Sequence, residues 1–257
     1  MKLPRGLSSL AGARSLTALA GAAAMLGPVV ALAAQPCAAA SAGAVAPVVE
    51  LYTSEGCNSC PPADRWLSAL KADPAVVALA FHVDYWDRLG WKDRFANPAF
   101  TARQAAQQAS NGARFSYTPQ VVVDGRDRTD WARVDVAGVS RNTAPVALTL
   151  VRRGESFAAD VTPLDGAPRR LAAYWAVTEQ GHVSAVRAGE NAGAALHHDF
   201  VVREYQPVAA WTARPGTAQS LAFAPASRPD ASHPRSVDLV VVDAATGRPV
   251  QALKLGC

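Results

Sequence analysis

The fold is decided by one stretch of sequence, Leu51-Tyr52-Thr53-Ser54-Glu55-Gly56-Cys57-Asn58-Ser59-Cys60-Pro61-Pro62. This stretch runs from an apolar strand into a helix, and its two thiols lie at the junction. Cysteines at this spacing close a small ring as a disulfide and open it again with little movement of the backbone. The N-terminus of a helix favours the thiolate that exchange chemistry requires, because its dipole is positive and its N–H groups are free. A Cys-x-x-Cys motif near a βαβ pattern therefore predicts a redox site.

The residues around the motif predict a small α/β domain in the order βαβαβ. Residues 48–52 form a short apolar strand, and the apolar positions of 63–70 repeat with the spacing of one helix face. The run 75–83 is apolar throughout, which suits a central parallel strand that is covered on both faces. Asn97-Pro98 begins a second helix, and 117–123 forms a third strand that is entered through a proline.

The pattern changes to a period of two after about residue 143. Apolar residues alternate in 146–150, 157–161, 171–177 and 237–241, with glycines between several of these runs. Many short alternating strands without a helical pattern predict a β-sandwich. The expected organisation is therefore a tether at 35–46, a first domain at 47–142 and an all-β sandwich domain at 143–257.

The first 34 residues have the features of a secretory signal peptide. A basic start precedes the apolar run 15–34, which ends in the small-residue sequence Ala31-Leu32-Ala33-Ala34. The alternative, a membrane anchor, is weak because Gly21, Gly27 and Pro28 interrupt the residues that a span needs. We expect a periplasmic or secreted protein with no stable membrane insertion after cleavage of residues 1–34.

The charge of the chain gives no reason to expect a nucleic-acid partner. The formal net charge is +4, and Lys2, Arg5 and Arg14 supply three of these charges within the predicted signal peptide. The remaining chain is nearly neutral, so it lacks the basic surface that binds phosphate backbones or anionic membranes. The sequence also has no Gly-x-Ser-x-Gly motif of a serine hydrolase and no glycine-rich phosphate-binding loop.

The two cysteines outside the motif are candidates for a structural disulfide. Cys37 lies near the expected mature start and Cys257 is the last residue. Export permits disulfides, and closing so long a loop would contribute about 5 kcal/mol in the chain-entropy model. The alternative is that each thiol is free at a frayed end, and spacing alone does not decide between the two.

The predicted topology brings several further residues to the thiols. If the first two strands are parallel, their carboxyl ends share one edge of the sheet, where open α/β sheets build their sites. An antiparallel third strand begins at that edge and brings Thr118 and Pro119 beside the motif. In the loop after the second strand, Trp86 either holds a substrate peptide or covers the sheet end, and Asp84 either relays protons or caps the loop.

Several segments of the sequence resemble one bacterial secreted family, the domain of unknown function 1223 of the thioredoxin-like superfamily. The matching segments are 49–57, 59–64, 81–86 and 117–120 within residues 48–126, and later 189–193 and 198–203. The resemblance implies a thioredoxin-like fold with a β-rich partner domain, but no established activity. It also implies that Pro119 is cis and faces the thiols, and that Thr118 contacts an extended substrate.

The sequence departs from well-studied thioredoxins at the buried carboxylate near the motif. Those proteins carry it six residues before the first thiol, whereas Glu50 stands seven residues before Cys57. Glu50 is either the proton acceptor for Cys60 or a carboxylate in a structural pair or in water. Pro61 disfavours helical geometry at Cys60, which moves the expected helix start beyond the thiols.

The motif has two other interpretations, a permanently closed disulfide and half of a metal site. A structural zinc site needs four ligands, and no second cysteine–histidine pair is present at short spacing. Copper(I) would use both thiolates and a third ligand, for which His82 is the candidate. In His197-His198-Asp199 the two histidines point to opposite faces of a strand, so packing or surface roles are expected.

The sequence as a whole predicts an exported thioredoxin-like thiol-disulfide oxidoreductase that acts on protein thiols. Cys57 attacks or is attacked, Cys60 resolves the mixed disulfide, and Thr118, Pro119 and Trp86 bind the partner chain. We expect no organic cofactor and no metal, because a protein dithiol or disulfide exchanges electrons directly. The alternatives are a non-catalytic binding module with a structural disulfide and a copper(I) chaperone.

Overall fold

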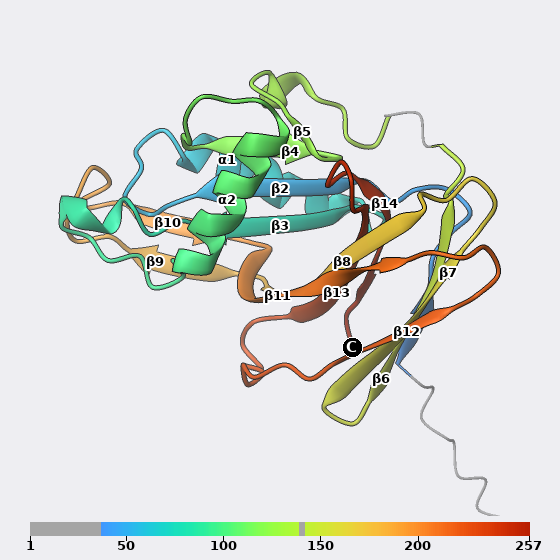
Figure 1. Ribbon diagram of the computed structural model, residues 1–257. Coiled ribbons are helices and arrows are strands. Elements are labelled where there is room, and N and C mark those ends of the chain that lie inside the picture. The colour runs from blue at the N-terminus through green and yellow to red at the C-terminus, as the bar shows by residue number, and fades with distance from the viewer. Residues whose placement is uncertain (1–36, 139–141) are drawn as a thin grey trace, which may run out of the picture. The chain divides into compact units, whose positions relative to one another are not determined.

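A computed structural model describes residues 37–138 and 142–257 (Figure 1). The described chain is mostly β-strand, with few helices and several sheets. The predicted signal peptide, 1–34, lies outside the described residues, as do 139–141 at the expected domain boundary. Pro36–Cys257 cluster as one compact unit.

The largest sheet has eight strands in the order β14-β13-β8-β11-β3-β2-β4-β5. Within it β2 pairs in parallel with β3 and antiparallel with β4, which is the pairing that the sequence pattern predicts. The bounds of these strands are β2 (Val48–Thr53), β3 (Val77–His82), β4 (Gln120–Val123), β5 (Arg126–Asp127), β8 (Arg170–Glu179), β11 (Val201–Thr212), β13 (Arg235–Asp243) and β14 (Pro249–Leu255).

The two halves of the chain share this sheet. Strand β11 pairs in parallel with β3 where Val201 lies opposite Ala80, and the N–H of Ala80 donates to the carbonyl of Phe200 at 2.8 Å. The segment 143–257, which was expected as a separate sandwich, therefore extends the sheet of the first half. The expected tether also differs, since Ala38–Ala40 form a strand, β1, that pairs antiparallel with β6.

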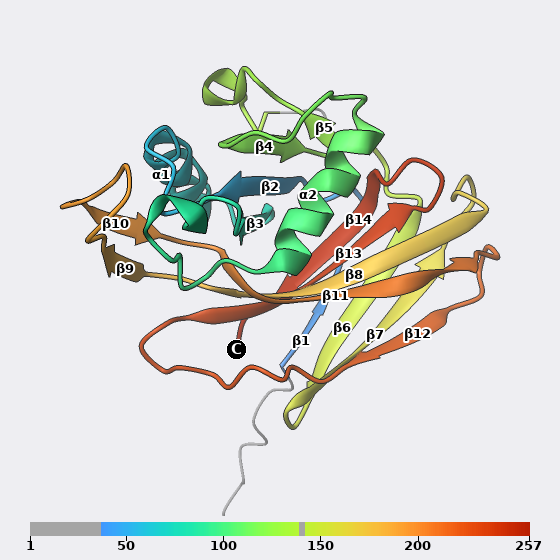
Figure 2. The same ribbon diagram turned by 60° about the vertical axis from the view of Figure 1, so that its left-hand side comes forward.

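A second sheet of four strands, in the order β1-β6-β7-β12, gives the second half a two-layer β arrangement (Figure 2). Alternate residues of the two sheets form one core, in which Leu148, Trp175 and Leu239 are fully buried. Cys37 beside β1 forms a disulfide with Cys257, which follows β14. The remaining strands are β6 (Val146–Arg153), β7 (Ser156–Pro163), β12 (Gln219–Phe223) and a separate hairpin of β9 (His182–Ala185) and β10 (Ala195–His198).

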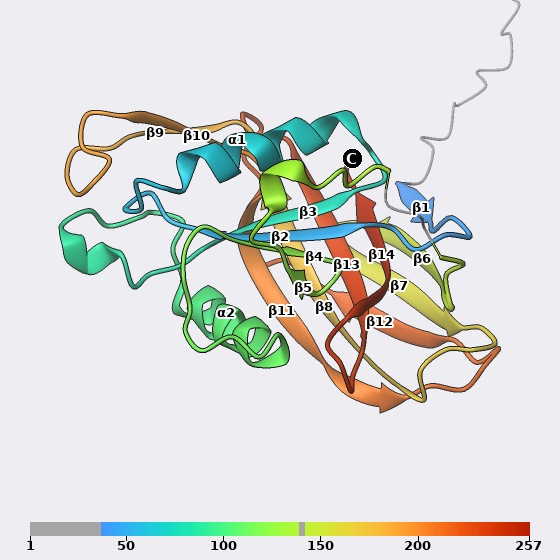
Figure 3. The ribbon, with the colours of Figure 1, turned by 90° about the horizontal axis from the view of Figure 1, so that it is seen from above.

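The two α-helices, α1 (Pro61–Ala69) and α2 (Pro98–Ser110), lie on opposite faces of β2 and β3 (Figure 3). Both begin with proline, which the first turn tolerates because its N–H groups have no partner within the helix. The side chain of Asn97 caps α2 by accepting from the N–H of Ala99 at 2.9 Å. Three short 3₁₀ helices complete the described chain: η1 (Leu70–Ala72), η2 (Asp87–Leu89) and η3 (Trp131–Arg133).

Alternation along β2 decides which side chains each helix covers. Val49 and Leu51 pack with Leu67 of α1, whereas Val48 and Tyr52 pack in the core that contains Phe100 of α2. Within the described residues, no helix is long and apolar enough to cross a membrane.

Candidate redox site

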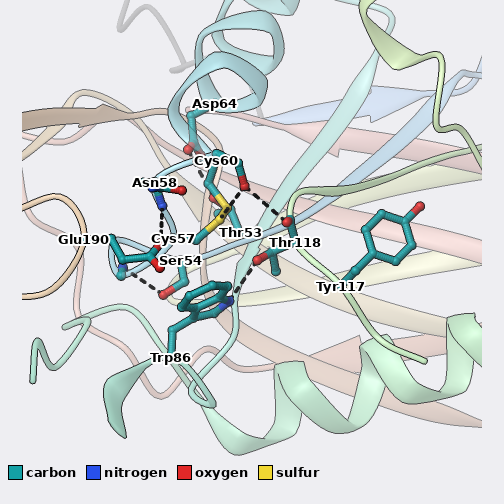
Figure 4. Close-up of a disulfide and its surroundings, with 12 residues drawn as sticks. Thr53, Ser54, Cys57, Asn58, Cys60, Asp64, Trp86, Tyr117, Thr118 and Glu190 are labelled. Atoms are coloured by element: carbon teal, nitrogen blue, oxygen red, sulfur yellow. Dashed lines mark hydrogen bonds between the residues drawn. A yellow bond between two sulfur atoms is a disulfide. The ribbon is translucent and has the colours of Figure 1, made fainter. Parts of the chain in front are cut away.

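Cys57 and Cys60 form a disulfide in the connection between β2 and α1 (Figure 4). Both residues are 0% exposed, although Asn58 and Ser59 between them are exposed. Cys60 is the N-cap of α1 and has helical backbone angles, and its carbonyl accepts from the N–H of Asp64 at 3.1 Å. Helix α1 therefore begins directly after Cys60, and Pro61 does not prevent helical geometry there.

The segment before β4 lies beside the disulfide loop. The peptide bond between Thr118 and Pro119 is cis, as the resemblance implies. The hydroxyl of Ser59 lies 3.3 Å from the sulfur of Cys57 and donates a long hydrogen bond of 3.5 Å to the carbonyl of Thr118. The indole N–H of Trp86 donates to Oγ1 of Thr118 at 2.8 Å, so the loop after β3 holds this segment in place.

The loop that joins β9 to β10 covers the disulfide loop from the second half of the chain. The backbone N–H of Asn58 donates to the carboxylate of Glu190 at 3.1 Å. The side-chain amide of Asn191 donates to the carbonyls of Glu55 and Cys57, at 2.8 Å and 3.0 Å. Glu190 and Asn191 are site residues that were not expected, although both belong to the segment 189–193 that resembles the family.

A buried group of charged side chains lies behind the disulfide. Nε2 of His198 is 3.6 Å from Oε1 of Glu55, and its Nδ1 is 3.8 Å from Oδ1 of Asp64. Burial alone would lower the pKa of His198, but the two carboxylates outweigh it and raise this pKa to about 9. Burial would raise the pKa of Glu55, but hydrogen bonding to His198 and to Trp91 lowers it below its ordinary value. The hydroxyl of Thr53 donates to Asp64 at 3.1 Å.

This group includes a histidine that the sequence did not assign to the site. His197 and His198 do point to opposite faces of β10, with His197 exposed and His198 buried. The sequence favoured a packing or surface role for both residues. The segment 198–203, which resembles the family, was the available signal for His198.

His82, the candidate third ligand for copper, lies in a buried ion pair. Its Nδ1 is 2.7 Å from Oδ2 of Asp93, and both side chains are fully buried. Burial alone would raise the pKa of Asp93, but His82 lowers it to about 2. Among residues 37–138 and 142–257, no group of three or more histidine, cysteine or acidic side chains is placed to hold a metal ion.

Glu50 has a different role from the proton acceptor that was considered for Cys60. Its carboxylate pairs with Arg103 of α2 and accepts from the hydroxyls of Tyr52 and Tyr174 at 2.7 Å and 2.6 Å. Gln107 of α2 also donates to it, at 3.2 Å. Glu50 therefore lies on the α2 face of the sheet, away from α1, and of the interpretations of Glu50 the structure supports the structural ion pair over the proton relay.

Asp84 is likewise a local structural residue in this conformation. Its Oδ1 accepts from the hydroxyl of Thr101 on α2 at 2.6 Å, and its N–H donates to the same hydroxyl at 3.2 Å. These bonds attach the loop after β3 to α2. Of the two interpretations of Asp84, the structure supports the one in which it orders the loop, and it gives no contact for a proton relay.

The fold and the site define a class of β-rich proteins in which a short-loop disulfide directly follows the carboxyl end of a central strand. The chain belongs to the family described as protein of unknown function (DUF1223), whose model matches residues 48–242. No curated protein matches it.

Two solved structures are similar to the chain. One is the crystal structure of protein AGR_C_4864 from Agrobacterium tumefaciens, with 27% identity and a TM-score of 0.62, covering 84% of this chain and 96% of that one. The other is HBP35 of Porphyromonas gingivalis, with 14% identity and a TM-score of 0.59, covering 83% of this chain and 75% of that one. The second likeness concerns the fold alone.

Proposed function

We propose that this chain is an exported thiol-disulfide oxidoreductase with a thioredoxin-like core, and that it acts on protein thiols through Cys57 and Cys60. The observation that carries the proposal is the position of Ser59, whose hydroxyl contacts both the sulfur of Cys57 and the carbonyl of Thr118. This contact joins the disulfide to the segment before β4, which can present backbone groups to a partner chain. The pairing of β2 with β3 and β4 supports the thioredoxin-like core.

The exchange proceeds through a mixed disulfide. A partner thiolate attacks the sulfur of Cys57, the bond between Cys57 and Cys60 breaks, and Cys60 leaves as a thiolate. The second thiol of the partner then attacks the mixed disulfide and releases Cys57. Two electrons and two protons pass from the partner dithiol, which becomes a disulfide, to the two cysteines. Thr118 and Pro119 position the partner, Trp86 fixes Thr118, and no organic cofactor takes part.

Exchange requires an opening of the loops that surround the motif. Both cysteines are 0% exposed, so a partner sulfur reaches Cys57 only when the covering residues move. Asn58 and Ser59 are exposed, and the hydrogen bonds from the β9–β10 loop to this segment involve Glu190 and Asn191. Movement of that loop would uncover the disulfide without unfolding of β2 or α1.

The same burial favours a second candidate function, a non-catalytic binding module in which the disulfide is purely structural. A fully buried disulfide is protected from thiols in the folded state. In that case replacement of Cys57 by alanine lowers stability but removes no activity, because partner recognition then resides elsewhere on the chain.

Trapping of partners tests the proposed function. The same exchange runs in reverse when the Cys57 thiolate attacks a partner disulfide and Cys60 then resolves the mixed disulfide. A Cys60→Ser variant, expressed with its own leader in the native host, can take the first of these steps but not the second. It should accumulate covalent adducts with specific proteins that a thiol reductant releases. The matched control is Cys57→Ser/Cys60→Ser, which should form none. Absence of adducts, together with a disulfide that resists dithiothreitol in the folded chain, would leave the structural-disulfide function as the better account.

Location is part of the proposal. Two disulfides are present, one joining Cys37 to Cys257 and one joining Cys57 to Cys60, and such bonds persist in oxidising compartments. We infer that the chain works in the periplasm or outside the cell. Fractionation of the native host, with the amino terminus of the mature chain determined by mass spectrometry, tests both the compartment and the predicted cleavage after residue 34.

A further inference from the structure

The buried group formed by Glu55, Asp64 and His198 has no role in the mechanism above. These residues come from three separate parts of the chain: the loop after β2, helix α1 and the end of β10. Each is less than one tenth exposed. Burial of ionisable side chains is costly unless their charges compensate one another, so their convergence behind one disulfide calls for a physical explanation.

The position of His198 fits an imidazolium. Its two ring nitrogens face different carboxylates, at 3.6 Å from Glu55 and 3.8 Å from Asp64. A neutral imidazole carries a proton on one nitrogen only and would turn a lone pair toward one of the two carboxylates. An imidazolium presents an N–H to both. His198 therefore holds its second proton at neutral pH, which agrees with the raised pKa given above.

The other groups packed around His198 are already matched in charge or are aromatic. The ring of His82 lies with its centroid 4.9 Å away, and its own partner is Asp93. The ring of Phe95 lies 5.8 Å away, and Trp91 donates to the second oxygen of Glu55 at 2.6 Å. The ring of Phe95 is also contacted by His182, Arg94 and Arg203. The two carboxylates are therefore the groups that set the charge of His198.

Asp64 connects this group to the disulfide. It lies one turn after Cys60 on α1, and its N–H donates to the carbonyl of Cys60. Its carboxylate accepts from the hydroxyl of Thr53, as the dashed line in Figure 4 marks. Cys60 is 0% exposed, so while the loops are closed its sulfur has no direct contact with water, and a proton would have to come from a neighbouring side chain.

We propose that His198 is a positioning residue of the redox site, which acts through Asp64 to hold the proton that Cys60 gains when the disulfide is reduced. This inference rests on the proposed function and names a residue for it. When the partner sulfur bonds to Cys57, Cys60 leaves as a thiolate and takes a proton from the His198–Asp64 pair. The pair regains a proton from the second partner thiol as that sulfur attacks the mixed disulfide. The proton of the first partner thiol ends on Cys57, so electrons and protons balance.

The test compares two neighbouring histidines. The rate at which dithiothreitol reduces the Cys57–Cys60 bond is measured from pH 5 to 10 in the full chain, by alkylation and mass spectrometry of the peptide that contains both cysteines. His198→Gln should react about tenfold or more slowly at pH 7. The reduction rate of this variant should also change with pH between about pH 5 and 8, where the unmodified chain shows no such step. The reason is that the buried carboxylates of Glu55 and Asp64, without the cation of His198, take up a proton in this range. His197→Gln, at the exposed adjacent position, should match the unmodified chain.

An unchanged rate and pH profile in folded His198→Gln would overturn the inference. If this variant does not fold, proton NMR of the unmodified chain replaces it. The midpoint of His198 should lie near pH 9 in the oxidised protein and move after reduction by dithiothreitol, while that of His197 stays constant. Equal midpoints of His198 in the two states would overturn the inference as well.

Failure of the proposed function has a different signature. In that case Cys60→Ser traps no partner protein, but reduction by dithiothreitol still depends on His198 as described. A disulfide that dithiothreitol does not reduce in the folded chain would overturn both the proposed function and the role of His198.

Discussion

The side-chain amide of Asn191 donates a hydrogen bond of 3.0 Å to the carbonyl of Cys57, which lies 134 residues earlier in the chain. The same amide donates to the carbonyl of Glu55 at 2.8 Å, and the adjacent Glu190 accepts from the N–H of Asn58. The loop between β9 and β10 thus fixes the Cys57 side of the disulfide loop. The disulfide of the first half of the chain is thus covered by a loop from the second half.

Replacement of Asn191 by alanine should make the disulfide more accessible. The variant loses both hydrogen bonds to the disulfide loop, so we expect reduction by dithiothreitol to be about 3- to 10-fold faster. The free energy of unfolding should fall by about 1–3 kcal/mol, because two carbonyls lose their donor. Asn191→Asp is the matched variant, since a carboxylate accepts but does not donate, and it should behave like alanine. Equal reduction rates in all three proteins would show that this loop does not control access.

The local elements of the first half follow from their residues. The prolines at the start of α1 and α2, the Asn97 cap and the apolar runs of β2 and β3 each act through neighbours in sequence, and the structure has these elements where they were expected. The joining of the two halves was not expected. It depends on the pairing of Val201 with Ala80, a contact between distant residues that alternation of apolar side chains does not encode.

The residues that surround the disulfide were only partly predictable from the sequence. The motif and Trp86 follow the ends of β2 and β3, and Thr118 and Pro119 precede the antiparallel β4, so topology alone places all of them at one edge of the sheet. For Glu50 the sequence left a proton relay and a structural pair open, and the structure supports the pair because one step along β2 exchanges the α1 face for the α2 face. Asn191 and His198 come from the second half of the chain, and their approach to the disulfide depends on how β9 and β10 fold back over α1.

Replacement of Glu50 by glutamine tests the correction of its role. The variant leaves Arg103 buried without its counter-ion, so we expect a loss of about 3–5 kcal/mol in the free energy of unfolding by urea. Reduction of the Cys57–Cys60 bond by dithiothreitol should keep its rate and pH profile, because Glu50 faces α2. The double variant Glu50→Leu/Arg103→Met, which buries no charge, should recover part of the stability. A pH profile altered in Glu50→Gln would restore the proton-relay interpretation.

The two disulfides should differ in their contribution to stability. The Cys37–Cys257 bond spans 220 residues and the Cys57–Cys60 bond spans three. In the chain-entropy model, replacing both cysteines of the long loop by serine costs about 5 kcal/mol and replacing those of the short loop costs about 2 kcal/mol. Urea unfolding of Cys37→Ser/Cys257→Ser and Cys57→Ser/Cys60→Ser measures both. Equal losses would mean that the unfolded chain retains structure that brings its ends together.

Asp238 should make the stability of the protein fall as the pH rises toward neutrality. Burial raises its pKa from the ordinary 3.8 to about 7, although Thr178, Lys254 and Ser236 each oppose this. Between about pH 4 and 7 the unfolded chain releases the proton of Asp238, whereas the folded chain retains it. The contribution of Asp238 to the free energy of unfolding is therefore fully present below about pH 4 and is lost as the pH rises to about 7. The loss at pH 8 is about 4 kcal/mol. Asp238→Asn, whose amide oxygen still accepts from Thr178, should lack this loss.

Urea unfolding at intervals between pH 4 and 8 provides the comparison. The stability of Asp238→Asn relative to the unmodified chain should increase steadily across this range, whereas that of Asp160→Asn, at an exposed position of β7, should not change. The direction of this pH dependence is informative, because a buried carboxylate with a cationic partner usually makes the free energy of unfolding rise with pH, whereas Asp238 should make it fall. A constant difference between Asp238→Asn and the unmodified chain at pH 4 and pH 8 would mean that Lys254 compensates the charge of Asp238 fully, and that β13 and β14 hold an ion pair rather than a protonated acid.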